Sequence, residues 1–158
     1  PRSTPLYSSA ASDVYKRQLD SFYEQWKHEP LVVDQWLITQ ALCPSDDALD
    51  RVKDLRKHQA FEIKNPNKVR SLIGTFCSQN HVQFHELGGQ GYEFLGDCII
   101  ELDQINPQIA ARLTTPLTRW RKYDYVRQAL IQAQLKRIKE VPQLSKDVFE
   151  VVEKSTIL

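Results

Sequence analysis

The sequence contains no methionine among its 158 residues, not even at position 1. Because translation begins with methionine, we expect the chain to be a processed product or a fragment. The first eighteen residues, Pro1–Gln18, mix serine, proline and basic residues without a sustained period, and they lack the apolar stretch of a signal peptide. We interpret this segment as non-native sequence derived from cloning, or alternatively as a disordered natural tail. The folded domain is then expected to span residues 19–158.

The sequence also lacks long apolar runs and an excess of charge of one sign. The 21 lysines and arginines are balanced by 20 aspartates and glutamates, which leaves a net charge of +1. No apolar run approaches the length of a membrane span, which excludes a transmembrane helix. The balanced charge provides no general attraction to nucleic acid or to an anionic membrane. We therefore expect neither nucleic acid nor membrane as a partner.

Cysteine and glycine are scarce. The three cysteines, Cys43, Cys77 and Cys98, are odd in number and far apart, which argues against a disulfide framework and favours a reducing compartment. Five glycines and eight prolines are too few for a linker or a low-complexity chain. A chain of this length and of ordinary composition is expected to form one domain with its own core.

The apolar residues that are present recur at helical spacing from Leu19 onward, and no segment shows sustained strand alternation. Proline suits the first turn of a helix and aspartate suits its cap, so we expect helix starts near Pro30, Pro66, Pro107 and Asp124. The helices are short, their connections are short, and an Asn-Pro start recurs at Asn65 and Asn106. These features predict an all-α fold, a superhelix of antiparallel helix pairs similar to a HEAT or armadillo solenoid.

The helical wheel also predicts which side chains are buried. In the first helix we expect one face formed by Phe22, Tyr23 and Trp26. In the longest helix we expect Val126, Ala129, Leu130, Ala133 and Ile138 to face inward. In the helix that begins at Pro107, Ile109 and Leu113 are expected to be buried, with Gln108 and Arg112 exposed beside them.

Three candidate motifs have simpler structural interpretations. His81 and His85 lie one turn apart, as in zinc-binding helices, but Val82 stands where the metalloprotease motif has glutamate, so we interpret them as ordinary surface or capping histidines. The glycine-rich stretch 88–91 follows no strand and contains no Gly-Lys-Ser/Thr, which favours a flexible connection over a phosphate loop. Cys77 is interpreted as a buried apolar residue rather than a nucleophile.

The segment Arg119–Tyr125 mixes cations with aromatic rings. Such a mixture can bind single-stranded nucleic acid, because bases stack on rings and cations follow the backbone. The alternative is a solvated helix face whose aromatic residues pack into the core.

Four segments carry a resemblance to a known family: Phe22–His28, Leu31–Trp36, Asn65–Gly74 and Asn106–Leu113. They strongly resemble the C-terminal domain of bacterial aminopeptidase N, and the likeness runs from about Leu19 to the end of the chain. That family consists of multi-domain zinc exopeptidases that remove N-terminal residues from peptides. The HExxH motif, the distant glutamate and the glycine-rich substrate motif of its catalytic domain do not occur in this sequence.

The resemblance implies a non-catalytic domain that closes over a catalytic domain and shapes the cavity that peptides enter. This chain is then expected to bind no cofactor of its own and to be inactive alone, while the parent enzyme holds zinc. Its implied partners are the catalytic domain of the same enzyme and peptide substrates, and its implied location is the cytoplasm.

The resemblance also implies that Gln108 and Arg112 line the substrate cavity. They lie four residues apart and share a helical face, and a guanidinium can hold a peptide carboxylate or carbonyl. The alternative is a solvated surface pair. At the level of the whole chain, two further hypotheses remain: a stand-alone helical repeat that binds a protein or peptide, and an RNA-binding repeat that uses Arg119–Arg127.

Overall fold

The structure, a computed structural model, describes the backbone of residues 5–157 and the side chains of residues 13–157. Within this range the regular elements are all helical, and none of these helices combines the length and apolar character needed to cross a lipid bilayer. The elements are α1 (Pro5–Trp26), α2 (Pro30–Ala41), α3 (Ala48–Arg56), α4 (Pro66–Val69), η1 (Arg70–Gly74), α5 (Thr75–Gln79), α6 (His81–Phe84), α7 (Gln90–Asp103), α8 (Pro107–Leu113), α9 (Thr115–Thr118), η2 (Trp120–Lys122), α10 (Tyr125–Lys139) and α11 (Lys146–Thr156).

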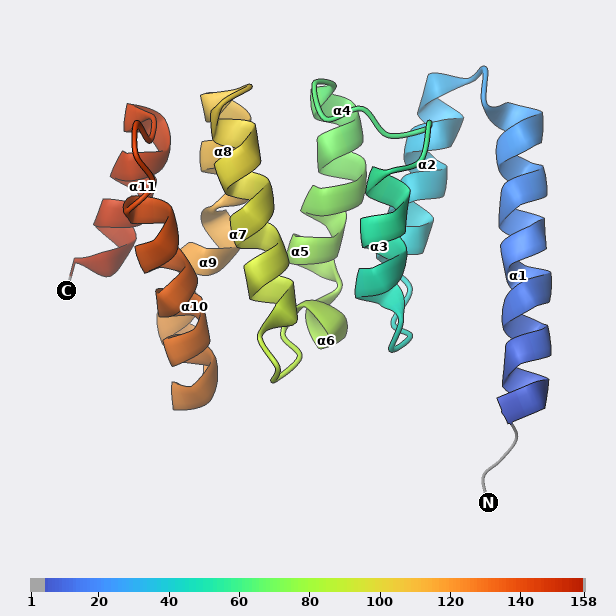
Figure 1. Ribbon diagram of the computed structural model, residues 1–158, viewed down its shortest axis with the longest axis horizontal. Helices are drawn as coiled ribbons and strands as arrows, with labels where there is room; N and C mark the ends of the chain where they lie inside the picture. The colour runs from blue at the N-terminus through green and yellow to red at the C-terminus, as the bar shows by residue number, and fades with distance from the viewer. Residues whose placement is uncertain (1–4, 158) are drawn as a thin grey trace.

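The helices stand side by side in chain order, from α1 at one end of the molecule to α11 at the other (Figure 1). They contact one another in two rows. One row contains α3, α6, α7 and α10; the other contains α2, the continuous helix α4–η1–α5, α8 with α9, and α11. The sequential pairs α2–α3, α7–α8 and α10–α11 join the rows. The predicted all-α solenoid of helix pairs is therefore confirmed.

Side-chain caps are present at three of the predicted helix starts and at the start of α11. Asn65, Asn106, Asp124 and Ser145 each accept a hydrogen bond from a backbone N–H two or three residues later, at 3.0–3.3 Å. Each such cap stabilises its helix by about 1 kcal/mol. The predicted starts at Pro30, Pro66 and Pro107 are confirmed, and α10 begins directly after its cap, Asp124.

An aromatic cluster lies where α5, α6 and α7 meet. Phe76 packs edge-on against Phe84 and Phe94 with ring centroids 6.2 Å apart, and Phe84 packs against Tyr92 at 5.2 Å. All four rings are buried. Edge-to-face pairs of this kind add about 0.5–1.5 kcal/mol each beyond the burial of their area. The cluster therefore holds the short helix α6 firmly against its neighbours.

The predicted faces of two helices were partly wrong. Among the described side chains of α1, residues 13–26, only Tyr23 is buried, since Phe22 and Trp26 are 42% and 39% exposed. In α10 the buried residues are Ile131, Leu135 and Ile138, whereas Val126 is 58% exposed and both alanines are exposed. Both α7 and α11 contact α10, and the three larger aliphatic side chains remove more apolar surface from water than the alanine-containing stripe would.

The first helix begins earlier than expected, at Pro5 rather than near Leu19. In its C-terminal half it contacts α2, where Trp36 Nε1 donates to the Leu19 carbonyl at 3.0 Å and the Tyr23 and Trp36 rings pack at 4.9 Å. The Arg51 guanidinium lies over the Tyr15 ring, 5.5 Å from its centroid. Pro1–Thr4 lie outside the described residues. The interpretation of Pro1–Gln18 as non-native sequence stays a prediction.

Two helical glycines provide a matched test of the packing. A Cβ at Gly91 would lie 2.3 Å from the Phe84 carbonyl oxygen, whereas a Cβ at Gly74 would meet nothing closer than 3.9 Å. We expect Gly91→Ala to lower the free energy of unfolding by about 1–3 kcal/mol, because α7 must move away from α6. Gly74→Ala should not lower it, since alanine favours a helix by up to about 1 kcal/mol. Urea unfolding followed by circular dichroism measures both, and equal losses in the two variants would contradict this packing.

Candidate functional site

A pocket of about 360 Å³ lies between the helix α4–η1–α5 and the pair α8–α9, and α6 and Tyr123 complete its lining. This volume is within the range of small-ligand sites in proteins. Its fifteen lining residues include three arginines, two histidines and a tyrosine, and none of them is aspartate or glutamate. The pocket therefore combines apolar surface with groups that are cationic or neutral.

The floor of the pocket is apolar. Ile109 and Leu113 are each 7% exposed, as predicted, and Cys77 is buried beside them. Burial raises the pKa of the Cys77 thiol well above its ordinary value, and the neighbouring Cys98 adds to this shift. The thiol therefore stays protonated at neutral pH, which agrees with its interpretation as an apolar residue.

Three arginines line the pocket from three different elements. Arg70 is the first residue of η1, Arg112 lies in the last turn of α8, and Arg119 directly precedes η2. All three side chains are exposed. Among residues 13–157, none of the three forms an ion pair with a carboxylate. No carboxylate at ion-pair distance therefore compensates their positive charge in the pocket.

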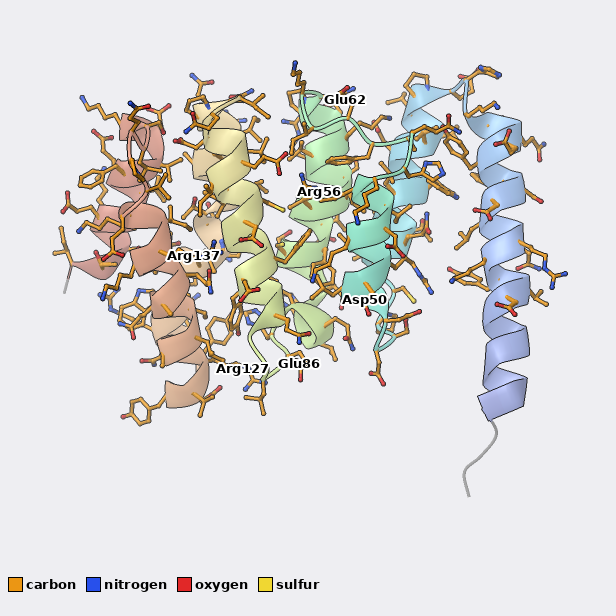
Figure 2. All side chains as sticks on the ribbon, in the orientation of Figure 1. Asp50, Arg56, Glu62, Glu86, Arg127 and Arg137 are labelled. Carbon is orange, nitrogen blue, oxygen red and sulfur yellow. The ribbon has the colours of Figure 1, made fainter. Side chains whose placement is uncertain are left out.

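Three arginines outside the pocket contrast with these three. In Figure 2, Arg56, Arg127 and Arg137 are labelled on helices of the other row. Each has a carboxylate partner, at 2.8 Å for Arg56 and Arg127 and at 2.9 Å for Arg137. Arg51 is paired in the same way, whereas Arg121, also outside the pocket, donates to the backbone carbonyls of Ser155 and Ile157.

A π-helical turn positions the first of the pocket arginines. The turn comprises η1, and the hydroxyl of Thr75 donates to the carbonyl of Arg70 at 3.3 Å. Ser71, Leu72 and Ile73 are all buried, so the two ends of the turn, Arg70 and Gly74, form its contribution to the pocket. Single π turns within α-helices occur frequently at functional sites.

An aromatic wall lines another side of the pocket. The rings of His81 and His85 are stacked with centroids 6.2 Å apart, and Tyr123 lies 4.4 Å from His85. His85 Nδ1 is 2.7 Å from the hydroxyl oxygen of Tyr92, within hydrogen-bonding distance. Its backbone carbonyl accepts a hydrogen bond from Arg127 Nε at 2.7 Å, near the end of α10 where Figure 2 labels this arginine.

Burial is the main cause that lowers the pKa of His85 to about 4, and His81 and Arg127 lower it further. Burial also raises the pKa of Tyr92 to about 12. Both groups are therefore neutral at pH 7. His85 therefore presents a neutral imidazole to the pocket, and the buried Tyr92 lies behind it.

The sequence-predicted residues are only partly brought together. Gln108 and Arg112 are both exposed on α8, as the helical wheel predicted, but only Arg112 is among the residues that line the pocket. Sequence reasoning missed Arg70 and placed Arg119 in a nucleic-acid hypothesis. The sequence does contain a pattern that could have identified Arg70 as a site residue. Arg70 and Arg112 each follow the proline of an Asn-Pro helix start, by four and five residues respectively.

The residues that the structure describes do not fit a zinc ion. Within the part of the chain that the structure describes, no three histidine, cysteine, aspartate or glutamate side chains come close enough together to hold a metal. The stacked pair of His81 and His85 thus lacks the third protein ligand that zinc sites require. No chemical step of this chain is assigned to a metal.

Two rows of short helices, stacked in chain order around a shared apolar interior, define an armadillo-type repeat domain. The chain belongs to the family described as a domain of unknown function (DUF3458_C) with ARM repeats, whose profile matches residues 5–157. The stated resemblance is confirmed, since the chain is homologous to the C-terminal region of bacterial aminopeptidase N.

Three relatives called aminopeptidase N show the extent of the match. The chain is 44% identical to the Haemophilus influenzae protein over 137 residues, 45% to the Caulobacter vibrioides protein over 152 residues and 39% to the Escherichia coli protein over 137 residues. These alignments cover 87%, 95% and 87% of this chain but only 16%, 18% and 16% of the relatives. The chain therefore spans less than a fifth of their length.

A solved structure gives the same result. Aminopeptidase A of Legionella pneumophila, in complex with aspartic acid, superimposes with a TM-score of 0.86 at 40% sequence identity. The superposition covers 91% of this chain and 17% of the Legionella protein.

The buried His85 should make the stability of the fold depend on pH. Its pKa is about 4 when folded and near its ordinary value of 6.5 when unfolded, so the unfolded chain takes up a proton first as the pH falls. The stability that neutral His85 provides should be fully present above pH 6.5 and be lost progressively between pH 6.5 and about 4. Urea unfolding at several pH values should show this loss in the wild type and in His81→Gln, but not in His85→Gln. Parallel profiles for all three proteins would contradict it.

The purified chain should neither retain stoichiometric zinc nor hydrolyse aminoacyl reporter substrates, because it lacks the three ligands and the general base that such chemistry needs. Metal analysis after dialysis against zinc, combined with a reporter assay on protein whose helical content has been verified, measures both. Hydrolysis that a chelator abolishes would show that this expectation is wrong.

Proposed function

We propose that this chain is the non-catalytic C-terminal domain of a zinc-dependent aminopeptidase N, where it caps the catalytic domain and shapes the cavity through which peptides reach the active site. One observation carries the proposal: Arg112 lies without an acidic partner in a pocket of a chain homologous to that C-terminal region. The whole enzyme would remove N-terminal residues from peptides in the cytoplasm.

The chain covers only a small share of its relatives, which supports the assignment of catalysis and substrate binding to different parts of the parent enzyme. More than four fifths of each relative lies outside the match. The zinc and its ligands would therefore come from the remainder of the parent polypeptide, which would also provide the surface on which this domain docks. This domain would contribute binding and orientation, which act on rate by reducing the freedom of the bound substrate.

The chemistry of the pocket suits a peptide. The exposed guanidinium of Arg112 can donate two parallel hydrogen bonds to a carboxylate or single ones to peptide carbonyls. The apolar floor of Ile109 and Leu113 can accept a side chain next to that polar group. Gln108, one turn before Arg112 on the exposed face of α8, would line the wider cavity outside the pocket.

The same pocket would also serve a stand-alone peptide-binding repeat, which is the second candidate function. The gene sequence upstream distinguishes the two, since a HExxH domain in the same reading frame is expected only for the peptidase. The RNA-binding hypothesis is less well supported. Trp120 and Arg121 both donate to the carbonyl of Ser155, so these groups of the basic–aromatic segment stabilise the fold.

In the enzyme that carries this domain, Arg112→Ala should lower kcat/KM for peptides by about 10- to 100-fold, since a hydrogen bond to a charged group contributes about 1.5–3 kcal/mol. A short aminoacyl reporter should be affected much less, because it does not reach the pocket. The free energy of unfolding should change by no more than about 0.5 kcal/mol at this exposed site.

A matched control is Lys136→Ala, which removes an exposed cation of α10 outside the pocket lining. Steady-state kinetics with peptides of several lengths checks the prediction. If Arg112→Ala turns over every peptide as the wild type does, Arg112 is only a solvated surface residue.

A further inference from the structure

We propose that Arg70, Arg112 and Arg119 together form a subsite for a peptide carboxylate, and that the enzyme carrying this domain favours peptides with a carboxylate downstream of the scissile bond. This inference rests on the proposed function, because it takes a peptide to be the occupant of the cavity. It goes further by naming the chemical group that the pocket selects and two residues, Arg70 and Arg119, that contribute to the selection.

The charge of the pocket is the first argument. Three guanidinium groups from three elements line one pocket whose other lining residues include no acid. Bringing like charges together on a rigid scaffold is unfavourable unless an anion compensates them. Arg56 and Arg137, outside the pocket, have neighbouring carboxylates at 2.8 and 2.9 Å, and Arg121 donates to two backbone carbonyls instead. The missing carboxylate in the pocket is therefore assigned to the ligand.

The π turn provides a second, independent argument. A regular α-helix through residues 66–79 would retain the ordinary ladder of hydrogen bonds, whereas the structure has five π-helical residues at Arg70–Gly74. Both ends of that turn line the pocket. At Gly74 the backbone itself is exposed to the pocket, and the Leu113 side chain lies 3.9 Å from where a Cβ would be. An irregular turn next to the site is consistent with the positioning of Arg70 for a ligand.

The aliphatic floor and the aromatic wall of the pocket determine which kind of side chain can bind next to the carboxylate. The floor is aliphatic, and the wall consists of the stacked imidazoles and the Tyr123 ring. Within this wall, His85 adds a ring rather than a full charge at pH 7. A side chain next to the carboxylate can therefore pack against aliphatic and aromatic groups. This arrangement suits one amino-acid residue of a peptide, bound through its carboxylate and its apolar atoms.

The carboxylate could come from the C-terminus of a peptide or from an acidic side chain. Matched peptides separate these sources in kinetic assays of the enzyme that carries this domain. One pair differs only in a C-terminal carboxylate or amide. A second pair, amidated at the C-terminus, differs only in a downstream aspartate or asparagine. We expect the wild type to have a KM about tenfold lower for the carboxylate member of at least one pair, and the responding pair identifies the source.

Variants then assign the preference to the pocket. Arg70→Ala and Arg119→Ala should each reduce the tenfold ratio to about two or less, whereas Lys136→Ala should retain it. Arg70→Lys should restore part of the ratio, because it returns the charge without the paired donors. The ratio should also fall as the salt concentration rises, since salt screens exposed charges. Thermal unfolding of each variant verifies that the domain remains folded.

The outcomes separate this inference from the proposed function. Equal KM values for both members of both pairs in the wild type would overturn the carboxylate subsite without any variant being needed. The carboxylate subsite would also be overturned if folded Arg70→Ala and Arg119→Ala retain the wild-type KM preference for the carboxylate peptide. In either case a loss of peptide turnover in Arg112→Ala would leave the proposed function standing. If Arg112→Ala changes nothing while the other two variants lose the preference, the subsite consists of Arg70 and Arg119 and the assignment of Arg112 is wrong.

Discussion

The packing of α6 against α7 is the contact on which the pocket depends. In a solenoid each helix contacts mainly its neighbours in the stack, so its position depends on those contacts. The carbonyl of Phe84 comes so close to Gly91 that no side chain fits between them, and the rings of Phe76, Phe84 and Tyr92 fill the junction. Because α6 is only four residues long, it would not persist without these contacts. They place His81 and His85 opposite the helices that supply the arginines.

The distribution of charge follows from this architecture. In one row, arginines bridge neighbouring helices, as Arg56 does from α3 to Glu101 of α7 and Arg137 does from α10 to Asp97 of α7. In the other row, the elements that carry Arg70, Arg112 and Arg119 border a pocket lined by no acidic side chain. The net charge of +1 conceals this separation. A local excess of positive charge, rather than the overall balance, is what a ligand in the pocket would meet.

Local signals in the sequence were sufficient to predict where most helices lie. They were not sufficient to predict which face of every helix is buried. Caps at Asn65, Asn106 and Asp124 act through atoms two or three residues away, so a reader of the sequence can locate them. The buried face of α10 depends on α7 and α11, which contact it from different directions. Its wheel offered more than one apolar stripe, and the neighbours selected the one containing Ile131 and Leu135.

The sequence by itself determined the class of fold, the family, and the helix starts near Pro30, Pro66, Pro107 and Asp124. It also determined the burial of Ile109 and Leu113 beside the exposed Gln108 and Arg112. These properties follow from short-range hydrogen bonds, from helical periodicity and from motifs that are contiguous in the chain. Only the tertiary structure decided that Arg112 lines the pocket whereas Gln108 does not, and that Arg70 and Arg119 join it there. Residues 42 and 7 positions away from Arg112 come together through the stacking of helices. That stacking is set by the shapes of buried side chains, and no local pattern in the chain encodes it.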